Sequence, residues 1–183
     1  DRIRMTDPES PYYRQAMELY AAGFPLHEQR RPEEQIQAMK DPAFHCDALV
    51  ESGTFIGLLF YWEAVGVTYV EHFAVVEALR SSGAGSRALA AFCPAHAPVV
   101  LEIDPPEDAV STRRKGFYQR LGFAENSYAH RRPPYRTGFA PHPLVVMSWP
   151  EALSPEAYST FSRMLSHRVM RYAQVGISQL AVT

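Results

Sequence analysis

Apolar residues recur along the chain with two different spacings, and the change between them predicts where strands and helices lie. Short, nearly continuous apolar segments bounded by turn residues are typical of buried strands. Segments in which apolar residues recur every three or four positions are typical of helices that pack on one face. The predicted strands cover residues 46–51, 54–62, 69–76, 99–103, 123–129 and 144–149, and the predicted helices cover residues 11–22, 32–40, 86–93, 110–121 and 155–172.

Turn residues mark the boundaries of several of these elements. Pro11 suits the first turn of a helix, and Gly23 is a natural residue at a helix end. Ser52-Gly53 predicts a tight hairpin turn between the first two strands. The order of the elements predicts an α/β (α+β) fold, with a mixed central sheet of about six to seven strands and helices on both faces.

Length and composition favour one packed domain. The chain has 183 residues, of which 46% are hydrophobic and 21% charged, which suffices for one α/β domain. We expect residues 1–150 to form this domain. We expect residues 151–183 to be a helical extension packed on it, and the weak pattern of residues 175–183 leaves disorder open there.

Charge and cysteine content exclude several classes of protein. The formal net charge of -2 argues against a broad nucleic-acid-binding surface. No apolar segment approaches the length of a membrane span, and the first residues lack the apolar core of a signal peptide. Cys46 and Cys93 are far apart in sequence and are predicted to be buried free thiols. We therefore expect a cytoplasmic protein. The histidines show no metal-ligand spacing, so we also expect no metal site.

The most specific pattern is the glycine-containing turn that follows the third predicted strand. Residues 80–85 read R-S-S-G-A-G and lead directly into a predicted helix. Gly83 and Gly85 allow unusual backbone dihedral angles and remove Cβ atoms, while the first N–H groups of the helix can bind an anion. A dinucleotide-binding turn would follow the first strand, and a P-loop would need a following Gly-Lys-Ser/Thr. The alternative, in which the glycines only form a tight turn and bind no ligand, is left open.

Residues 80–85 match the R/Q-x-x-G-x-G/A signature of the GNAT acetyltransferases, and residues 117–123 resemble the second signature of that family, F-Y-x-x-x-G-F. The resemblance covers residues 45–130 best. Within the family, the chain resembles uncharacterised bacterial members. It implies acetyl-CoA as co-substrate, with its pyrophosphate at the turn. It also implies that the pantetheine arm follows the 69–76 strand where that strand splays from the 99–103 strand. The residues that it implies for acetyl-CoA binding are Phe73, Ala74, Val75, Arg80, Ser81, Ser82, Gly83, Ala84, Gly85 and Ser86.

The chain departs from the family pattern in one place. The usual asparagine seven residues before the signature tyrosine is replaced by Ser111. Residues 113–115, Arg-Arg-Lys, are unusually basic, and they either contact the phosphates of CoA or form a solvated helix face.

Two residues are candidates for catalysis. The resemblance places an acid or a histidine near Glu71 as the general base, and regular strand alternation predicts Glu71, Phe73 and Val75 on one face of the sheet. A structural ion pair is the alternative for Glu71, and His72 is the rival base. Tyr118 matches the tyrosine that serves as general acid in many family members, and the alternative is an ordinary aromatic core residue.

Three further residues are candidates for acceptor binding. Glu28 lies in the loop region where this fold builds its acceptor pocket, and Glu102 lies on the strand that splays from the Glu71 strand. Both acids suit a cationic amine, and either could be a surface charge. Tyr135 belongs to a proline-rich segment that either lines the cleft or is a plain connector.

The resemblance therefore implies an N-acetyltransferase that transfers an acetyl group to a primary amine of a small molecule or peptide, by direct attack in a ternary complex. A catalytically silent module that binds acyl-CoA is the alternative. We expect no nucleic-acid or membrane partner, and a homodimer is left open.

Overall fold

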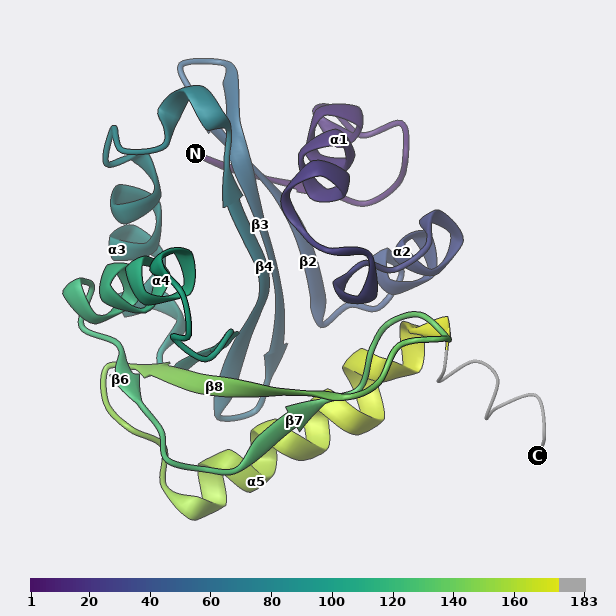
Figure 1. The fold of residues 1–183 in the computed structure, drawn as a ribbon. Coiled ribbons are helices and arrows are strands. Elements are labelled where there is room, and N and C mark those ends of the chain that lie inside the picture. Colours follow the sequence, from purple (N-terminus) through teal and green to yellow (C-terminus); the bar gives the residue numbers. More distant parts are fainter. Residues whose placement is uncertain (175–183) are drawn as a thin grey trace.

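Eight strands form one mixed sheet in the order β1-β2-β3-β4-β5-β8-β6, with β7 paired to β8 (Figure 1). The computed structural model describes residues 1–174, so the prediction for residues 175–183 lies outside the described residues. The strands are β1 (Arg2–Met5), β2 (Phe44–Glu51), β3 (Thr54–Ala64), β4 (Val67–Val75), β5 (Val99–Ile103), β6 (Ala124–Glu125), β7 (His130–Arg132) and β8 (His142–Trp149).

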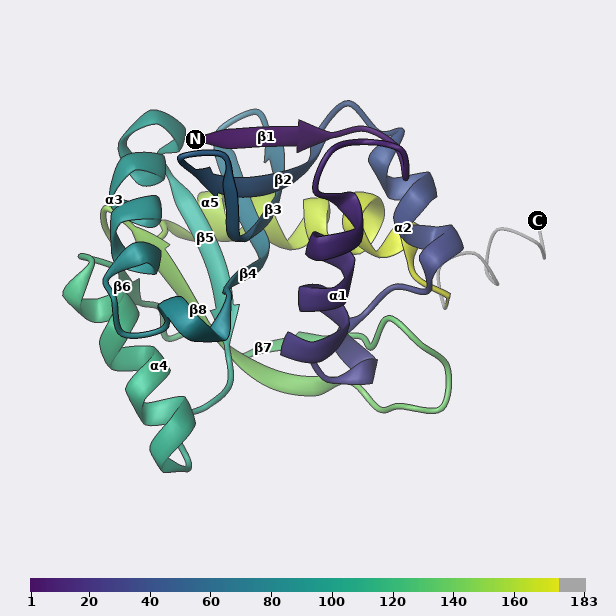
Figure 2. The same cartoon turned by 90° about the horizontal axis from the view of Figure 1, so that it is seen from above.

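Helices cover both faces of the sheet, as the sequence predicted (Figure 2). The helices are α1 (Tyr13–Gly23), α2 (Pro32–Met39), α3 (Ala84–His96), α4 (Ala109–Arg120) and α5 (Pro155–Met164), with short 3-10 turns at Leu26–Glu28 and Glu77–Leu79. α1, α2 and α5 lie on one face, which we call the α5 face, and α3 and α4 lie on the other, the α3 face. The predicted helix 155–172 begins as α5 and continues as a π turn at Leu165–Val169 and a 3-10 turn at Met170–Tyr172.

The sequence underestimated the number of strands at both ends of the sheet. β1 pairs with β2 as an edge strand. Its exposed Arg2 and Arg4 alternate with Ile3 and Met5, but four residues are too few for this alternation to stand out in the sequence. Within the predicted strand 123–129 only β6 forms, and β7 follows it at residues 130–132; the two short strands pair with different parts of β8. Short edge strands carry too few residues for a clear periodic signal.

The hairpin between β2 and β3 has the predicted tight turn. Ser52 and Gly53 have φ angles of 49° and 77°, which is the combination of two positive φ values that a type I′ turn requires.

β4 and β5 pair in parallel and then separate, which confirms the predicted splay. Their paired residues run from Thr68 opposite Val99 to Val70 opposite Leu101, whereas β4 continues to Val75. The backbone groups of β4 beyond Val70 therefore have no partner on β5, and a gap opens between the carboxyl ends of the two strands. Ligands bind preferentially at such openings in α/β sheets.

A β-bulge on β4 contradicts the predicted alternation. Phe60 pairs with His72 and Tyr61 pairs with Val70, so Glu71 is an extra residue with no partner on β3. A bulged residue interrupts the period of two, because two residues on one strand oppose one on the other.

The bulge places Glu71 on the opposite face from Phe73 and Val75. The ring of His72 packs on Tyr20 of α1, with ring centroids 4.8 Å apart, so His72 also lies on the α5 face. Phe73 packs in the cluster on the α3 face. The prediction that Glu71, Phe73 and Val75 share one face is therefore wrong.

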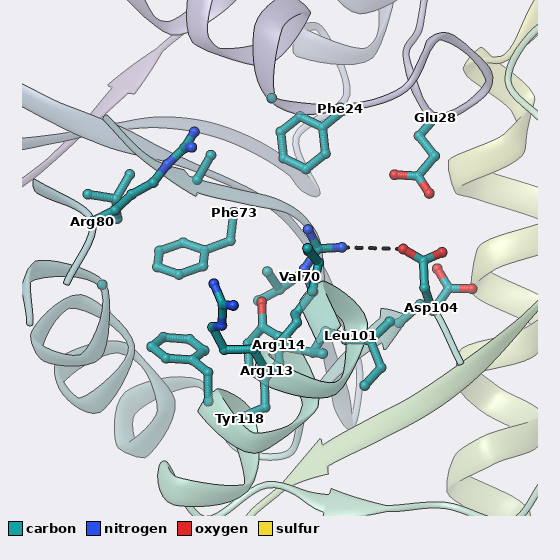
Figure 3. Close-up of a pocket in the computed structure, with 18 of the residues that line it drawn as sticks. Phe24, Glu28, Val70, Phe73, Arg80, Leu101, Asp104, Arg113, Arg114 and Tyr118 are labelled. Carbon is teal, nitrogen blue, oxygen red and sulfur yellow. Dashed lines mark hydrogen bonds and ion pairs between the residues drawn. The ribbon is translucent and has the colours of Figure 1, made fainter. Parts of the chain in front are cut away.

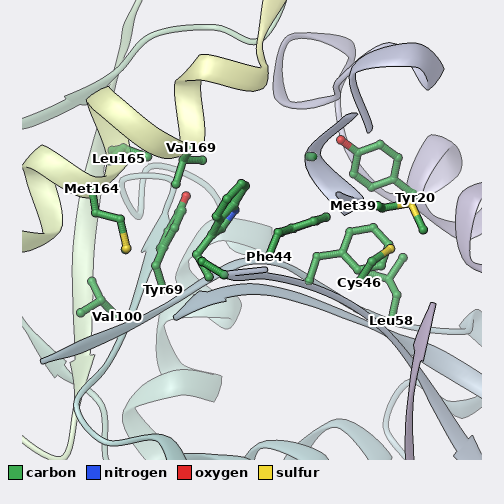
Figure 4. Packing of buried hydrophobic residues seen from close by; sticks show 14 of the residues in the cluster. Tyr20, Met39, Phe44, Cys46, Leu58, Tyr69, Val100, Met164, Leu165 and Val169 are labelled. Carbon is green, nitrogen blue, oxygen red and sulfur yellow. The ribbon is translucent and has the colours of Figure 1, made fainter. Parts of the chain in front are cut away.

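Buried aromatic and aliphatic side chains fill the α5 face of the sheet (Figure 4). Phe44 on β2 and Tyr69 on β4 pack beneath Val169, which follows α5. A fully buried side chain of this size stabilises the fold by about 1.5–3 kcal/mol. Cys46 lies in this cluster and Cys93 in the cluster on the α3 face, and both are buried free thiols, as predicted.

Gly57 on β3 allows close approach of the strand that borders the splay. A Cβ on Gly57 would collide with the backbone oxygen of Ala74 and lie 3.2 Å from the Cα of Val75. We therefore expect Gly57→Ala to lower the free energy of unfolding by about 1–3 kcal/mol, measured by denaturant titration. Gly116→Ala is the control, since the nearest atom is the flexible end of Arg120 and alanine favours a helix interior. Equal stability of Gly57→Ala and the wild type would contradict the close approach.

Candidate functional site

A cavity of about 760 Å³ occupies the gap between β4 and β5 (Figure 3). Arg80, from the turn before α3, lies at one end, and Glu28 and Asp104 lie at the other. Phe73 of β4 and Tyr118 of α4 lie between these two ends. One continuous cavity thus connects a basic end, next to the start of α3, with an acidic end.

The turn at the basic end has the geometry of an anion-binding site. Gly83 caps α3 with a φ of 81°, a left-handed conformation that glycine adopts without strain. The helix begins at Ala84, two residues earlier than predicted. The N–H groups of Gly85 and Ser86 lie in its first turn, where an α-helix offers them no acceptor. A Cβ built on Gly85 would lie 3.4 Å from Val75 and 3.5 Å from Phe73, in ordinary van der Waals contact with the cavity wall.

Three arginine side chains in the cavity lining have no acidic partner among residues 1–174: Arg80, Arg113 and Arg120. In contrast, Arg114 pairs with Asp104 at 3.3 Å and Lys115 pairs with Glu125 at 2.5 Å. Within the basic segment 113–115, Arg113 and Arg114 therefore line the cavity and Lys115 does not; contact with the phosphates of CoA stays a prediction.

Most of the residues implied for acetyl-CoA binding line this cavity: Phe73, Ala74, Val75, Arg80, Ser81, Gly83, Gly85 and Ser86. Ser82 and Ala84 do not line it. The Ser82 hydroxyl donates to the carbonyl of Leu79, and Ala84 is buried. These two residues therefore support the turn on the side that faces away from the cavity.

Ser111 has a structural role. Its hydroxyl accepts from the N–H of Asp108, and the Asp108 carboxylate accepts from the N–H of Ser111 at 2.7 Å. This capping box starts α4 and satisfies N–H groups that the helix leaves unpaired.

Tyr118 lies on α4 in the cavity wall, and its ring packs against Phe117 and Phe123. Burial raises the pKa of Tyr118 to about 12, so the phenol keeps its proton at neutral pH. No side chain or backbone group among the described residues forms a hydrogen bond with its hydroxyl. The packing agrees with a core aromatic, and the position in the wall agrees with a proton donor.

Glu71 forms a buried ion pair with Arg30. The Arg30 guanidinium donates two hydrogen bonds to the carboxylate, at 2.6 and 3.0 Å, and both side chains are 0% exposed. Trp62 Nε1 donates to the same carboxylate at 2.8 Å, and the Tyr135 hydroxyl donates to it as well. Each carboxylate oxygen therefore accepts more than one hydrogen bond.

This environment is unsuitable for a general base. Burial acts to raise the pKa of Glu71, but the charge of Arg30 and the hydrogen bonds from Arg30 and Tyr135 together outweigh it and lower the pKa to about 2. A carboxylate with so low a pKa is a weak proton acceptor at neutral pH. Since the side chain is fully buried, Glu71 borders the cavity through its main chain. The geometry favours the structural ion pair, the alternative that the sequence left open.

The rival base, His72, is also enclosed. Burial lowers the pKa of His72 to about 4, and its Nε2 forms a hydrogen bond of 2.8 Å with the carbonyl oxygen of Glu28. The residue is 1% exposed and is not part of the cavity lining. His72 therefore positions the Glu28 segment and does not face the cavity.

Glu102 borders the cavity, but its carboxylate is buried in a second polar network. His130 Nε2 lies 2.5 Å and Arg132 Nη1 3.3 Å from it, and the Tyr69 hydroxyl donates to it. Burial acts to raise the pKa of Glu102, but the charge of Arg132 and the hydrogen bonds from His130 and Tyr69 together outweigh it and lower the pKa. Its side chain is 2% exposed, so the carboxylate is not available to an acceptor.

Tyr135 does not line the cleft. It is 0% exposed, its N–H donates to the carbonyl of His27, and its hydroxyl is held by Glu71. The expectation that Tyr135 contacts the acceptor is therefore not supported by its position.

Glu28 is the predicted acceptor residue whose carboxylate faces the cavity. Its side chain is 16% exposed, and burial raises its pKa. Arg132 Nη2 lies 3.8 Å from its Oε1, and Figure 3 shows Asp104 on the neighbouring wall. The nearest imidazoles are those of His27 and His142, and the three residues bring potential metal-ligand atoms within 4.8 Å of one another.

Similarity to known proteins shows which family the chain belongs to. Residues 13–123 match the model of the acetyltransferase (GNAT) family. The chain belongs to the GNAT family of acetyltransferases. It is 31% identical to an acetyltransferase of the GNAT family from Bacteroides thetaiotaomicron, with a TM-score of 0.85 over 93% of this chain and 98% of that one. As a GNAT acetyltransferase, it is an acetyl-CoA-dependent acyltransferase.

More distant GNAT structures share the fold. An aminoglycoside 6'-N-acetyltransferase in complex with coenzyme A is 15% identical, with a TM-score of 0.55 over 81% of this chain and 95% of that one. A GNAT acetyltransferase from Elizabethkingia anophelis with acetyl-CoA bound is 14% identical, with a TM-score of 0.54 and the same coverage. No protein of curated function matches the sequence. None of the helices in residues 1–174 has the length and apolar character of a membrane span.

Sequence reasoning missed several residues of this GNAT site. Arg30 and Arg132 carried no motif, because each acquires its acidic partner from a distant part of the chain. The strongest available signal was the buried acid on β4, since a buried carboxylate requires a cation and the chain offers several arginines.

Replacing Glu71 tests its structural role. We expect Glu71→Gln to lower the free energy of unfolding by about 3 kcal/mol, because it leaves the fully buried Arg30 charge without its partner. Denaturant titration at pH 7 measures the loss. A variant with unchanged stability and a large loss of turnover would instead establish Glu71 as the base.

The low pKa of Glu71 predicts that the stability loss in Glu71→Gln depends on pH. The folded-state pKa of Glu71, about 2, lies below its ordinary value of 4.5, so the unfolded chain binds the proton more tightly. The stabilisation is complete above pH 4.5 and is lost as the pH falls towards 2. The stability difference between wild type and Glu71→Gln should therefore shrink over that range, measured by titrations from pH 6 to 2. A constant difference would contradict the assignment.

Proposed function

We propose that this acetyltransferase transfers the acetyl group of acetyl-CoA to a primary amine of a small molecule or peptide, by direct attack in a ternary complex. The observation that carries this proposal is the single cavity with a basic end and an acidic end. An anionic co-substrate and a cationic acceptor can enter it from opposite ends and meet between them. A covalent enzyme intermediate needs a nucleophile, and both cysteines are buried outside the cavity lining.

The basic end fits the phosphates of CoA. The N–H groups of Gly85 and Ser86 at the start of α3 suit a phosphate oxygen, and no Cβ obstructs the approach at Gly83 and Gly85. The unpaired guanidinium groups of Arg80, Arg113 and Arg120 add the charge that several phosphates require. The unpaired main chain of β4 beyond Val70 offers hydrogen bonds to an extended amide-containing arm.

The transfer replaces one bond to the acyl carbon with another. Acetyl-CoA supplies an activated thioester, in which the C–S bond breaks as the amine nitrogen forms a C–N bond. The amine gives up a proton, and the thiolate takes one. Tyr118 Oη holds a proton at neutral pH in the wall between the two ends, which supports its role as the donor to sulfur.

The acidic end supports a cationic acceptor. Glu28 and Asp104 lie on adjacent walls, and the Glu28 carboxylate is the one that no arginine binds at hydrogen-bond distance. Glu28 attracts and orients the ammonium form of the acceptor before it loses its proton. Glu71 and Glu102 contribute by fixing the two strands that frame the cavity.

The direct test is release of the CoA thiol from acetyl-CoA across a panel of primary amines, read with a thiol reagent. We expect amine-dependent release, and we expect Tyr118→Phe to lower kcat about 100-fold with little change in the KM for acetyl-CoA. Tyr13→Phe is the matched control, because it removes a hydroxyl outside the cavity lining.

Two results would contradict the proposal. Acetyl-CoA binding without thiol release for any amine would instead favour a catalytically silent acyl-CoA-binding module. Thiol release that Tyr118→Phe leaves unchanged would keep the reaction but remove Tyr118 as the proton donor.

A further inference from the structure

His27, Glu28 and His142 form a cluster of potential metal ligands, of which the proposed acetyl transfer uses Glu28 and neither histidine. His27 and Glu28 belong to the 3-10 turn at Leu26–Glu28, and His142 begins β8. His27 Nε2 and His142 Nε2 each lie 3.8 Å from Glu28 Oε1. The two imidazole rings meet edge to face, with centroids 4.8 Å apart. Residues more than a hundred positions apart therefore present two nitrogens and one oxygen to a common point.

His142 is unusual because both of its ring nitrogens are buried and unpaired. Neither nitrogen has a hydrogen-bond partner among the described residues, although each is shielded from solvent. Buried polar atoms nearly always have a partner, so an unpaired pair of them requires a reason. A ligand that accepts the lone pair of an imidazole nitrogen supplies that reason for one of the two nitrogens.

We propose that His27, Glu28 and His142 bind one Zn²⁺ ion. Two histidines and one glutamate are a donor set that zinc adopts in catalytic sites, where a fourth position stays open. Zinc bond lengths place tetrahedral ligand atoms about 3.3 Å apart. Each histidine nitrogen, now 3.8 Å from Glu28 Oε1, would move about half an ångström closer to it, and the ligand atoms, which lie within 4.8 Å of one another, would draw together around the ion. Of the three residues, Glu28 lines the cavity, which places the ion at its acidic end.

The surrounding contacts hold the ligands in place. The carbonyl of Glu28 is bonded to His72 at 2.8 Å, and the carbonyl of His27 accepts from the N–H of Tyr135 at 2.9 Å. His142 is fixed by strand pairing with Arg132. Such outer contacts orient metal ligands and reduce the rearrangement that binding requires.

The charge balance permits a divalent cation. The Arg132 guanidinium lies 3.8 Å from Glu28 Oε1, but Arg132 is also 3.3 Å from the Glu102 carboxylate, which neutralises it. Asp104 lies at the same end of the cavity but pairs with Arg114 at 3.3 Å, so Glu28 carries the negative charge that remains there. The ion therefore meets a local excess of carboxylate.

Zinc titration of the tag-free, chelator-treated full chain tests the site without acetyl-CoA or amine. We expect one Zn²⁺ per chain with micromolar or tighter affinity, measured by competition with a chromophoric chelator. Zinc K-edge absorption of the loaded protein should show imidazole and oxygen ligands at about 2.0–2.2 Å. Because no substrate is present, failure of the proposed acetyl transfer would not affect this result.

Variants locate the ion. His142→Ala and Glu28→Gln should each weaken zinc binding at least about 10-fold. His96→Ala is the matched control, since His96 and His45 pair with Glu63 elsewhere on the protein and form the rival histidine–carboxylate cluster. Thermal unfolding of each metal-free variant checks that it is folded. Absence of stoichiometric binding would overturn the proposal, and so would binding that His96→Ala weakens and His142→Ala does not.

Discussion

The buried pair of Arg30 and Glu71 is the interaction on which the arrangement of this protein depends. Two full charges without solvent contact are stable only while each satisfies the other. Glu71 comes from the central strand, and Arg30 comes from the segment before α2. Tyr135 joins the pair from the loop before β8, and the carbonyl of Val169 accepts from Arg30 after α5. One ion pair thus connects four segments that are distant in sequence.

The bulge that places Glu71 in this pair also shapes the cavity on the other side of the sheet. Because the bulge inserts a residue, Glu71 and His72 both lie on the α5 face, while Val70 and Phe73 lie on the α3 face opposite Tyr118. The splay then leaves the main chain of β4 open beside the turn before α3. β4 therefore contributes to the buried ion pair on the α5 face and to the wall of the cavity on the α3 face. The acidic groups divide accordingly, with Glu71 and Glu102 inside the structure and Glu28 at the cavity.

Local patterns predicted the parts of the fold and site that local chemistry determines. The turn at residues 80–85 and the hairpin at Ser52-Gly53 depend on backbone conformations that few residues adopt, so their sequences identify them. The faces of β4 could not be predicted, because the bulge arises from pairing with β3 and leaves no mark in the sequence of β4. The burial of Tyr135 and the meeting of His142 with Glu28 depend on long-range packing, which spacing along the chain does not encode.

The central claim is that Arg30 and Glu71 stabilise the fold as a unit, and a double-mutant cycle measures this most directly. The free energy of unfolding is determined for the wild type, Arg30→Met, Glu71→Met and the double variant. Each single replacement should lower the free energy of unfolding by about 3–5 kcal/mol, because it leaves one buried charge unpaired. The loss in the double variant should be smaller than the sum of the two single losses by about 2 kcal/mol or more, which is a coupling energy typical of residues in direct contact. Additive losses, within about 0.5 kcal/mol, would contradict the account.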